Sequence, residues 1–197
     1  MRNKYSISEF LKMIYSLVMT KIWMFHARLI RRPIYIRGAK SLAGCRNLTT
    51  GRFCRFDLEG KHNTLYIGDN CEIGDMTHIV AYNSVEIGDN VLIASKCFIS
   101  DTNHGNYSGD KQDSPETIPN ERSLIVGKTK IGNNVWIGEN AVVLSGADIG
   151  DGCIVGANAV VNKSIPKGSM VVRNNKIIKS WDQETKKWER IKGKGLF

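Results

Sequence analysis

The chain has 197 residues, 42% of them hydrophobic, and only four prolines, which fits one folded domain with its own core and argues against general disorder. Its net charge of +9 is uneven: residues 1–55 carry twelve Lys and Arg against one acid, residues 56–162 six against fifteen, and residues 163–197 ten against three. Basic ends around an acidic middle indicate anionic partners at particular places, and the lack of a basic stretch studded with aromatic residues argues against nucleic-acid binding.

The first segment, residues 1–33, is apolar but is predicted to be neither a signal peptide nor a membrane span. Lys12, Lys21 and Arg28 interrupt it, no small-residue cleavage site follows, and its longest uncharged run is too short to cross a bilayer. Ser8 is a candidate N-cap for a helix whose apolar residues have helical spacing: Phe10, Leu11, Ile14, Leu17, Val18, Ile22 and Phe25. Two interpretations stay open, a helix packed on the body of the protein or an interfacial helix whose basic end contacts anionic lipid.

The middle of the chain repeats every six residues. Ile recurs at positions 67, 73 and 79 and again at 87, 93 and 99, and Ile or Val occupies every sixth position from 125 to 161. A helix would need a period of about 3.6 and a hairpin strand plain alternation. Six-residue units instead predict short strands joined by bends, three to a coil, with coils stacked at about the usual strand spacing. The sequence therefore predicts an all-β parallel β-helix over residues 34–172, followed by a basic tail at 173–197.

Four positions after each Ile or Val between 125 and 161 stands a small or β-branched residue. We expect these residues to point into the coil together with the Ile and Val residues: Thr129, Val135, Ala141, Ala147, Cys153, Ala159 and Ile165. The five cysteines are odd in number and show no CxxC or metal-ligand spacing, which is typical of reduced thiols in a cytoplasmic protein. Cys71, Cys97 and Cys153 fall in the small inward position, so packing is their expected role. No metal is expected.

Two blocks, SVEIGDNVLIASKCFISDTNHG and KIGNNVWIGENAVVLSGADIGDGCIVGANAVVNKSIP, resemble the left-handed β-helix hexapeptide-repeat acyltransferases. Among these, they are most similar to the O-acetyltransferases of galactoside, maltose and bacterial surface polysaccharide. The resemblance implies left-handed coils, acetyl-CoA as the acetyl donor, and a homotrimer with its active sites between subunits.

The repeat stops at residues 101–124, a long polar loop with His104 at its start. Loops that project from a rigid scaffold often carry function, and a histidine can accept a proton at neutral pH. By spacing alone, an ordinary loop histidine is the favoured interpretation. The resemblance implies that His104 is the general base, which deprotonates an acceptor hydroxyl for direct attack on the thioester. It also places Trp136, of the VWIG segment, beside that histidine, with packing against a neighbouring subunit as the alternative role.

Binding residues are also predicted. The resemblance implies that the cofactor contacts Trp136, Gly138, Ala157, Asn158 and Lys163, with the lysine near its phosphates. Arg173 and Lys176 of the basic tail are candidates to add positive charge there, and a merely solvated tail is the alternative. The segment VVRNNKIIKSW replaces the family's usual Gly-x-Pro turn, so adenine contacts are not carried over. Asp75, His78, Asn83 and Asp101 are candidate acceptor contacts, and solvated surface residues are the alternative for each.

The expected function is an acetyl-CoA-dependent O-acetyltransferase acting on a sugar hydroxyl of a bacterial surface polysaccharide or its lipid-linked precursor. We expect it in the cytoplasm, with peripheral contact to the inner membrane as an option. Alternatives are an acetyltransferase of a small sugar, amine or xenobiotic, and a non-catalytic β-helix scaffold. A zinc enzyme on this fold would need three histidines, and none follows His104.

Overall fold

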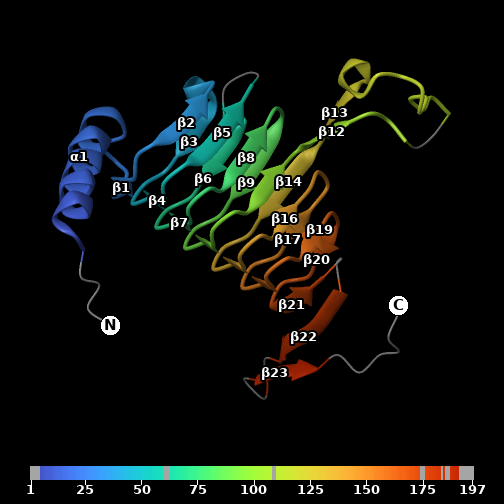
Figure 1. Ribbon diagram of the computed structural model, residues 1–197. Helices are drawn as coiled ribbons and strands as arrows, with labels where there is room; N and C mark the ends of the chain where they lie inside the picture. Colours follow the sequence, from blue (N-terminus) through green and yellow to red (C-terminus); the bar gives the residue numbers. More distant parts are fainter. Residues whose placement is uncertain are drawn as a thin grey trace.

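In the computed structural model the chain forms the expected left-handed parallel β-helix, with one N-terminal helix and an arm that projects after residue 100 (Figure 1). The structure describes residues 5–59, 63–107, 110–173, 176–182, 184 and 187–190. Within these residues the coils are built from three sheets, here called sheets 1, 2 and 3.

Each sheet collects one strand from every coil, so strands far apart in sequence lie side by side in parallel register. Sheet 1 has the order β1 (Leu29–Ile30), β4 (Thr49–Thr50), β7 (Glu72–Ile73), β10 (Leu92–Ile93), β15 (Trp136–Ile137), β18 (Ile154–Val155) and β21 (Ser169–Val172). Sheet 2 contains β2 (Ile34–Arg37), β5 (Cys54–Leu58), β8 (His78–Ala81), β11 (Phe98–Ser100), β16 (Val142–Val143) and β19 (Val160–Val161). Sheet 3 contains β3 (Leu42–Gly44), β6 (Leu65–Ile67), β9 (Ser84–Ile87), β14 (Lys128–Ile131), β17 (Asp148–Ile149) and β20 (Ser164–Ile165).

The six-residue repeat identifies the core. Its large members at 67, 73, 79, 87, 93, 99, 131, 137, 143, 149, 155 and 161 are at most 3% exposed, and so are the small members that follow them from Thr129 to Ile165. Ile125 is the exception, with 41% of its surface exposed. It belongs to β13 (Leu124–Val126) of the arm, so the inward series resumes only with Thr129 and Ile131.

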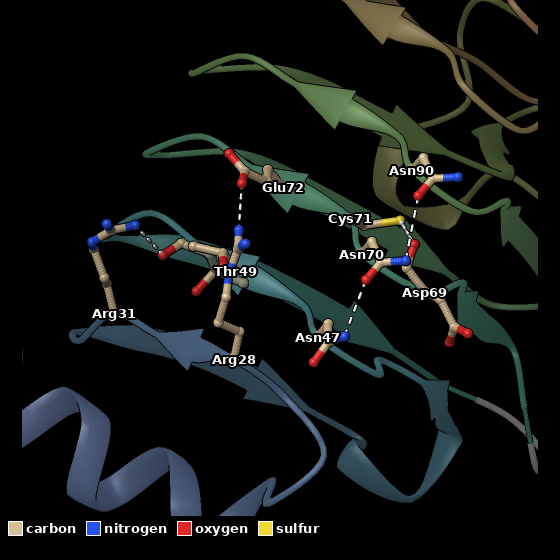
Figure 2. A network of polar contacts seen from close by, with 10 residues as sticks. Arg28, Arg31, Asn47, Thr49, Asp69, Asn70, Cys71, Glu72 and Asn90 are labelled. Carbon is tan, nitrogen blue, oxygen red and sulfur yellow. Dashed lines mark hydrogen bonds and ion pairs between the residues drawn. The ribbon is translucent and has the colours of Figure 1, made fainter.

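Asparagines turn the chain between sheets. Asn47, Asn70, Asn90 and Asn134 all have φ between 56° and 57°, the left-handed region that Asn tolerates better than most residues. Their side chains stack one coil above another, and each Nδ2 donates to the next Oδ1. The distances are 3.1 Å from Asn47 to Asn70 and 3.3 Å from Asn70 to Asn90 (Figure 2), and 3.2 Å from Asn90 to Asn134. The ladder pins the register of successive coils.

Helix α1 (Ile7–Trp23) lies across the N-terminal end of the coil stack (Figure 1). Its N-cap is Ser6 rather than the expected Ser8, because Ser6 and Glu9 form a capping box in which each side chain binds the other's backbone N–H. The helix does pack on the body, but through a polar face. Ser16 and Thr20 are its buried residues, whereas the apolar side chains expected to pack are exposed.

The arm begins where β12 (Thr102–His104) leaves sheet 2 and pairs antiparallel with β13. A short 3-10 turn, η2 (Pro119–Glu121), lies in the arm between β12 and β13. Figure 1 shows that the arm projects away from the stacked coils. A second short turn, η1 (Ala39–Ser41), lies between β2 and β3.

The last strands that the structure describes are β22 (Lys176–Asp182) and β23 (Lys187–Arg190), which extend sheet 1 in antiparallel fashion at the end opposite α1 (Figure 1). Among the described residues no helix is both long and apolar enough to cross a membrane. The domain limits expected near residues 33 and 172 stay predictions.

Candidate functional site

A groove of about 470 Å³ lies on the outer face of sheet 2, at the point where the arm leaves the coils. Outward residues of neighbouring strands stack here in register: Arg55 beside His78, and His78 beside Phe98. The lining includes both His78 and His104, with Phe98, Leu124 and Leu144 as apolar walls. The structure thus brings together the two histidines that the sequence suggested for catalysis and for acceptor binding.

His104 is exposed at the end of β12, opposite Leu124 of β13. Its backbone is held firmly, since the hydroxyl of Tyr107 donates to the carbonyl oxygen of His104 over 2.6 Å. Nη1 of Arg122 in turn donates to that hydroxyl over 3.0 Å. Between them, Gly105 has a φ of 100°, which favours glycine, and its N–H donates to the Ser123 carbonyl over 2.8 Å. These contacts position the root of the arm and leave the imidazole at the groove.

His78 has a carboxylate partner that the sequence pattern did not reveal. Nε2 of His78 lies 3.0 Å from Oδ2 of Asp57, and Nε of Arg55 lies 2.6 Å from the same oxygen. Burial alone would raise the pKa of Asp57, whose side chain is 13% exposed, but the hydrogen bonds from His78 and Arg55 outweigh it and hold that pKa below its ordinary value. Asp57 is therefore an anion that orients His78 at the groove wall.

The other three candidate acceptor residues lie away from this groove. Asp101 is fully buried, and its carboxylate accepts the backbone N–H groups of Tyr82, Asn83 and Ser84 over 2.7–3.1 Å. Asn83 donates its Nδ2 to the carbonyl of Gly127 over 2.7 Å. Asp75 sits at another corner, where Oδ1 accepts the Arg52 N–H over 2.6 Å. The contacts of Asp101 and Asn83 secure the bend from which the arm emerges.

Trp136 lies on β15 of sheet 1 with 50% of its surface exposed. It pairs in register with Leu92 and Ile154, and it does not line the groove around His104. Within one chain, the two residues expected to act together thus stand on different faces of the coil.

The residues expected to hold the cofactor gather toward the C-terminal coils. Gly138 and Ala157 occupy successive turns at one corner, where a Cβ on Gly138 would approach the Ala157 nitrogen to 2.5 Å. Asn158 follows with a φ of 58°. Exposed Lys163 and Arg173 belong to the last coil, where the Val160 N–H donates to the Arg173 carbonyl over 3.2 Å. Arg173 follows β21 of sheet 1, at the same corner as Gly138, Ala157 and Asn158, whereas Lys163 lies at the next bend, between β19 and β20. Exposed cations near a corner where backbone groups approach closely are of a kind that can bind the phosphates of coenzyme A. The side chain of Lys176 lies outside the described residues.

All five cysteines are buried, free thiols. Burial raises the pKa of each, to about 12 for Cys45 and about 11 for Cys54. Such thiols are poor nucleophiles at neutral pH. In the part of the chain that the structure describes, no group of three or more His, Cys, Asp or Glu could hold a metal ion.

Comparison with known proteins identifies the repeats. Residues 128–163 match the family described as bacterial transferase hexapeptide (six repeats), and residues 65–99 match the hexapeptide repeat of succinyl-transferase. A putative lipopolysaccharide biosynthesis O-acetyl transferase of Escherichia coli K12, WbbJ, is 38% identical over 190 residues, which cover 95% of this chain and 96% of that protein. A probable acetyltransferase of Mycobacterium tuberculosis is 33% identical over 58% of this chain and 36% of its own length.

Solved structures agree on the fold. The N-acyltransferase AntD of Bacillus cereus, in complex with a dTDP-amino sugar and coenzyme A, aligns over 94% of both chains with a TM-score of 0.68 and 21% identity. A hexapeptide-repeat acetyltransferase of Vibrio cholerae, solved with acetyl coenzyme A, aligns over 65% of this chain and 66% of its own, with a TM-score of 0.54 and 28% identity.

Proposed function

Because the chain belongs to the hexapeptide-repeat transferase family and is an acetyltransferase, we propose that it transfers acetyl from acetyl-CoA to a sugar hydroxyl. The proposed acceptor is a bacterial surface polysaccharide or its lipid-linked precursor, and the proposed place of action is the cytoplasm. The observation that carries this proposal is the groove in which His104 stands at the root of the arm, across from a second histidine fixed by Asp57. The likeness to WbbJ along almost the whole chain supports the choice of acceptor class.

His104 accepts the proton of the acceptor hydroxyl as its oxygen attacks. The thioester supplies an activated acetyl carbon, so that the new ester C–O bond forms as the C–S bond breaks. His104 then returns the proton to the departing thiolate, and the base is regenerated. Direct transfer of this kind is supported by the buried cysteines, because burial raises their pKa values and so disfavours the thiolate that would carry the acetyl group.

The acceptor occupies the groove beside His78. The imidazole of His78, oriented by Asp57, offers a hydrogen bond to a sugar hydroxyl. The donor lies along the later coils, with Gly138, Ala157 and Asn158 at its pantetheine portion and Lys163 and Arg173 near its phosphates. Lys176 is assigned to the same phosphate-binding end on the strength of its sequence position alone.

A homotrimer completes this proposal. Trp136 is half exposed on sheet 1 and does not line the His104 groove of its own chain, so Trp136 of a neighbouring subunit would cover the reacting groups. The active sites then lie between subunits, and each needs two chains.

The test is turnover of acetyl-CoA with a panel of oligosaccharides, amino sugars and small amines, followed as release of free thiol. His104→Ala is expected to lower kcat/KM by about 10²–10⁴-fold, with a base-labile sugar ester as the wild-type product. His26→Ala is the matched control, because His26 is exposed on the segment between α1 and β1 and does not line the groove. Unchanged turnover in His104→Ala would remove the base assignment, and turnover of amines alone would favour the small-molecule alternative.

A further inference from the structure

Helix α1 leaves its apolar stripe exposed, whereas most surface helices bury theirs against the body of the protein. Its buried side chains are Ser16 and Thr20, at 2% and 1% exposure. Both are satisfied: the hydroxyl of Ser16 accepts the Arg32 N–H over 3.2 Å and donates to the Lys12 carbonyl over 2.8 Å. The hydroxyl of Thr20 accepts the Ile30 N–H over 2.9 Å. This polar face is a specific attachment to the first coil, and it fixes which side of the helix points outward.

The outward face is a continuous aliphatic stripe. Ile7, Leu11, Ile14, Val18 and Ile22 are spaced by four, three, four and four residues, which places them on one side of a helix. Their exposed fractions are 82%, 60%, 43%, 52% and 73%. The aromatic side chains of Phe10, Trp23 and Phe25 are exposed as well. A contiguous apolar surface of this kind is uncommon on a soluble monomer and marks a contact with something apolar.

The charge around α1 favours a lipid bilayer over a second copy of the chain as the partner that covers the aliphatic stripe. The first 55 residues carry twelve Lys and Arg against one acid, and that acid, Glu9, is engaged in the capping box. Exposed Lys12 and Lys21 belong to α1 itself and exposed Lys40 belongs to the adjoining coil, whereas Arg37 and Arg46 are paired with Asp57 and Asp69. Two copies meeting through this face would bring two basic ends together, whereas an anionic lipid surface would complement them.

We propose that α1 docks the protein on an anionic lipid bilayer, with the aliphatic stripe lying in the plane of the interface. At 17 residues the helix is about 25 Å long, and no helix among the described residues can span a membrane, so it lies on the surface. Phe25, exposed just beyond the C-terminus of the helix, suits the headgroup region, where aromatic side chains are favoured. Trp23 lies on the other side of the helix, where Arg32 sits 5.6 Å from the centre of its ring. Because α1 lies across one end of the stack (Figure 1), docking leaves the sides of the coil, including the His104 groove, accessible. This inference does not depend on the reaction proposed above.

The test is co-sedimentation of the full chain with vesicles of phosphatidylcholine containing about 30% phosphatidylglycerol, compared with phosphatidylcholine alone. Wild-type protein is expected to bind the anionic vesicles and to be released in part by high salt. Leu11→Gln combined with Val18→Gln is expected to lower the partition coefficient by at least about tenfold, since each change removes a buried aliphatic contact with lipid. Lys12→Glu is expected to weaken binding only to the anionic vesicles.

Tyr66→Gln is the control, because Tyr66 is an aromatic residue of similar exposure, 45%, on the outer face of sheet 3. It is expected to bind vesicles like the wild type. Wild-type protein that ignores anionic vesicles would overturn the proposal, as would unchanged binding by the double variant. If the double variant instead lowers the mass measured by light scattering while vesicle binding is unaltered, a second copy covers the stripe and the proposal fails. Turnover of a soluble acceptor is expected to be equal in all these variants, so failure of docking and failure of the proposed reaction are distinguishable.

Discussion

Nε2 of His78 and Oδ2 of Asp57 are joined by a 3.0 Å hydrogen bond between neighbouring coils, across 21 positions of sequence. Strands β5 and β8 set the two side chains on the outer face of sheet 2, and the ring of Phe98 lies 5.3 Å from that of His78 on the next coil. His78 is therefore fixed on two sides at the wall of the groove that also contains His104.

Removing this carboxylate is expected to weaken acceptor binding. Asp57→Asn keeps the size of the side chain but lacks the charge that both His78 and Arg55 contact, so the acceptor KM should rise by about tenfold with a smaller change in kcat. His78→Gln should have a similar effect, and the two changes should not add, because they act through the same contact. Asp148→Asn, an exposed change on sheet 3, is the control. An acceptor KM unaltered in both variants would contradict the role given to His78.

The same carboxylate predicts a pH dependence of stability. The pKa of Asp57 is lowered in the folded protein, so the folded state binds the proton less readily than the unfolded state does. Its contribution to the free energy of unfolding is present above about pH 4, the unfolded value for an aspartate, and is lost as the pH falls through the lowered folded pKa. The free energies of unfolding of the wild type and Asp57→Asn, measured with urea, should thus differ at pH 7, and the difference should shrink as the pH falls below about 4. A difference that does not change with pH would refute this account.

The periodicity of the sequence predicted the coil well because a solenoid repeats one local rule. Each Ile or Val of the repeat from 131 to 161 meets the same constraint, a buried slot between the coils above and below, and each is buried as expected. Ile125 fits the spacing but belongs to the arm, because periodicity cannot tell the last residue of an insertion from the first residue of the next coil.

The six-residue repeat could not predict which side chains of neighbouring coils contact one another. Asp57 faces His78 only after the chain has completed a coil, and the register that aligns them is set by packing. Helical spacing likewise predicted α1 but not its orientation, because the sequence pattern of an apolar stripe is the same whether the stripe faces the body of the protein or the outside. The buried hydroxyls of Ser16 and Thr20 decide that question, and their partners lie 16 and 10 residues away.

Asp101 is predicted to support the structure at the base of the arm. Its fully buried carboxylate accepts three backbone N–H groups from residues 82–84, and Asp101→Asn would turn an NH₂ group toward at least one of these donors. The free energy of unfolding should fall by about 2–4 kcal/mol, measured by urea denaturation. Asp110→Asn, exposed in the arm, should change it by less than about 0.5 kcal/mol. A loss of acceptor affinity without a loss of stability would instead support the direct substrate contact that the sequence suggested.

The thiols are predicted to be inert in the native protein. With a pKa of about 12 for Cys45 and about 11 for Cys54, the thiolate fraction at pH 8 is about one in a thousand or less. Iodoacetamide should therefore label none of the five cysteines within an hour at pH 8, whereas all five should react in denaturant, as counted by mass spectrometry. Rapid labelling of one native cysteine would reveal an accessible thiolate and would reopen the question of an acyl-enzyme.

The hydroxyl of Tyr107 is predicted to position the base. It donates to the His104 carbonyl over 2.6 Å and accepts from Nη1 of Arg122 over 3.0 Å, so Tyr107→Phe loosens the arm where the imidazole is attached. We expect kcat to fall by about three- to tenfold while the KM for acetyl-CoA is unchanged, because the donor is assigned to the later coils. Tyr66→Phe provides the same chemical change on sheet 3 and should leave kcat unaltered. If Tyr107→Phe lowers the melting temperature and kcat together, the hydroxyl holds the fold of the arm as a whole; an unchanged kcat would mean that His104 needs no such support.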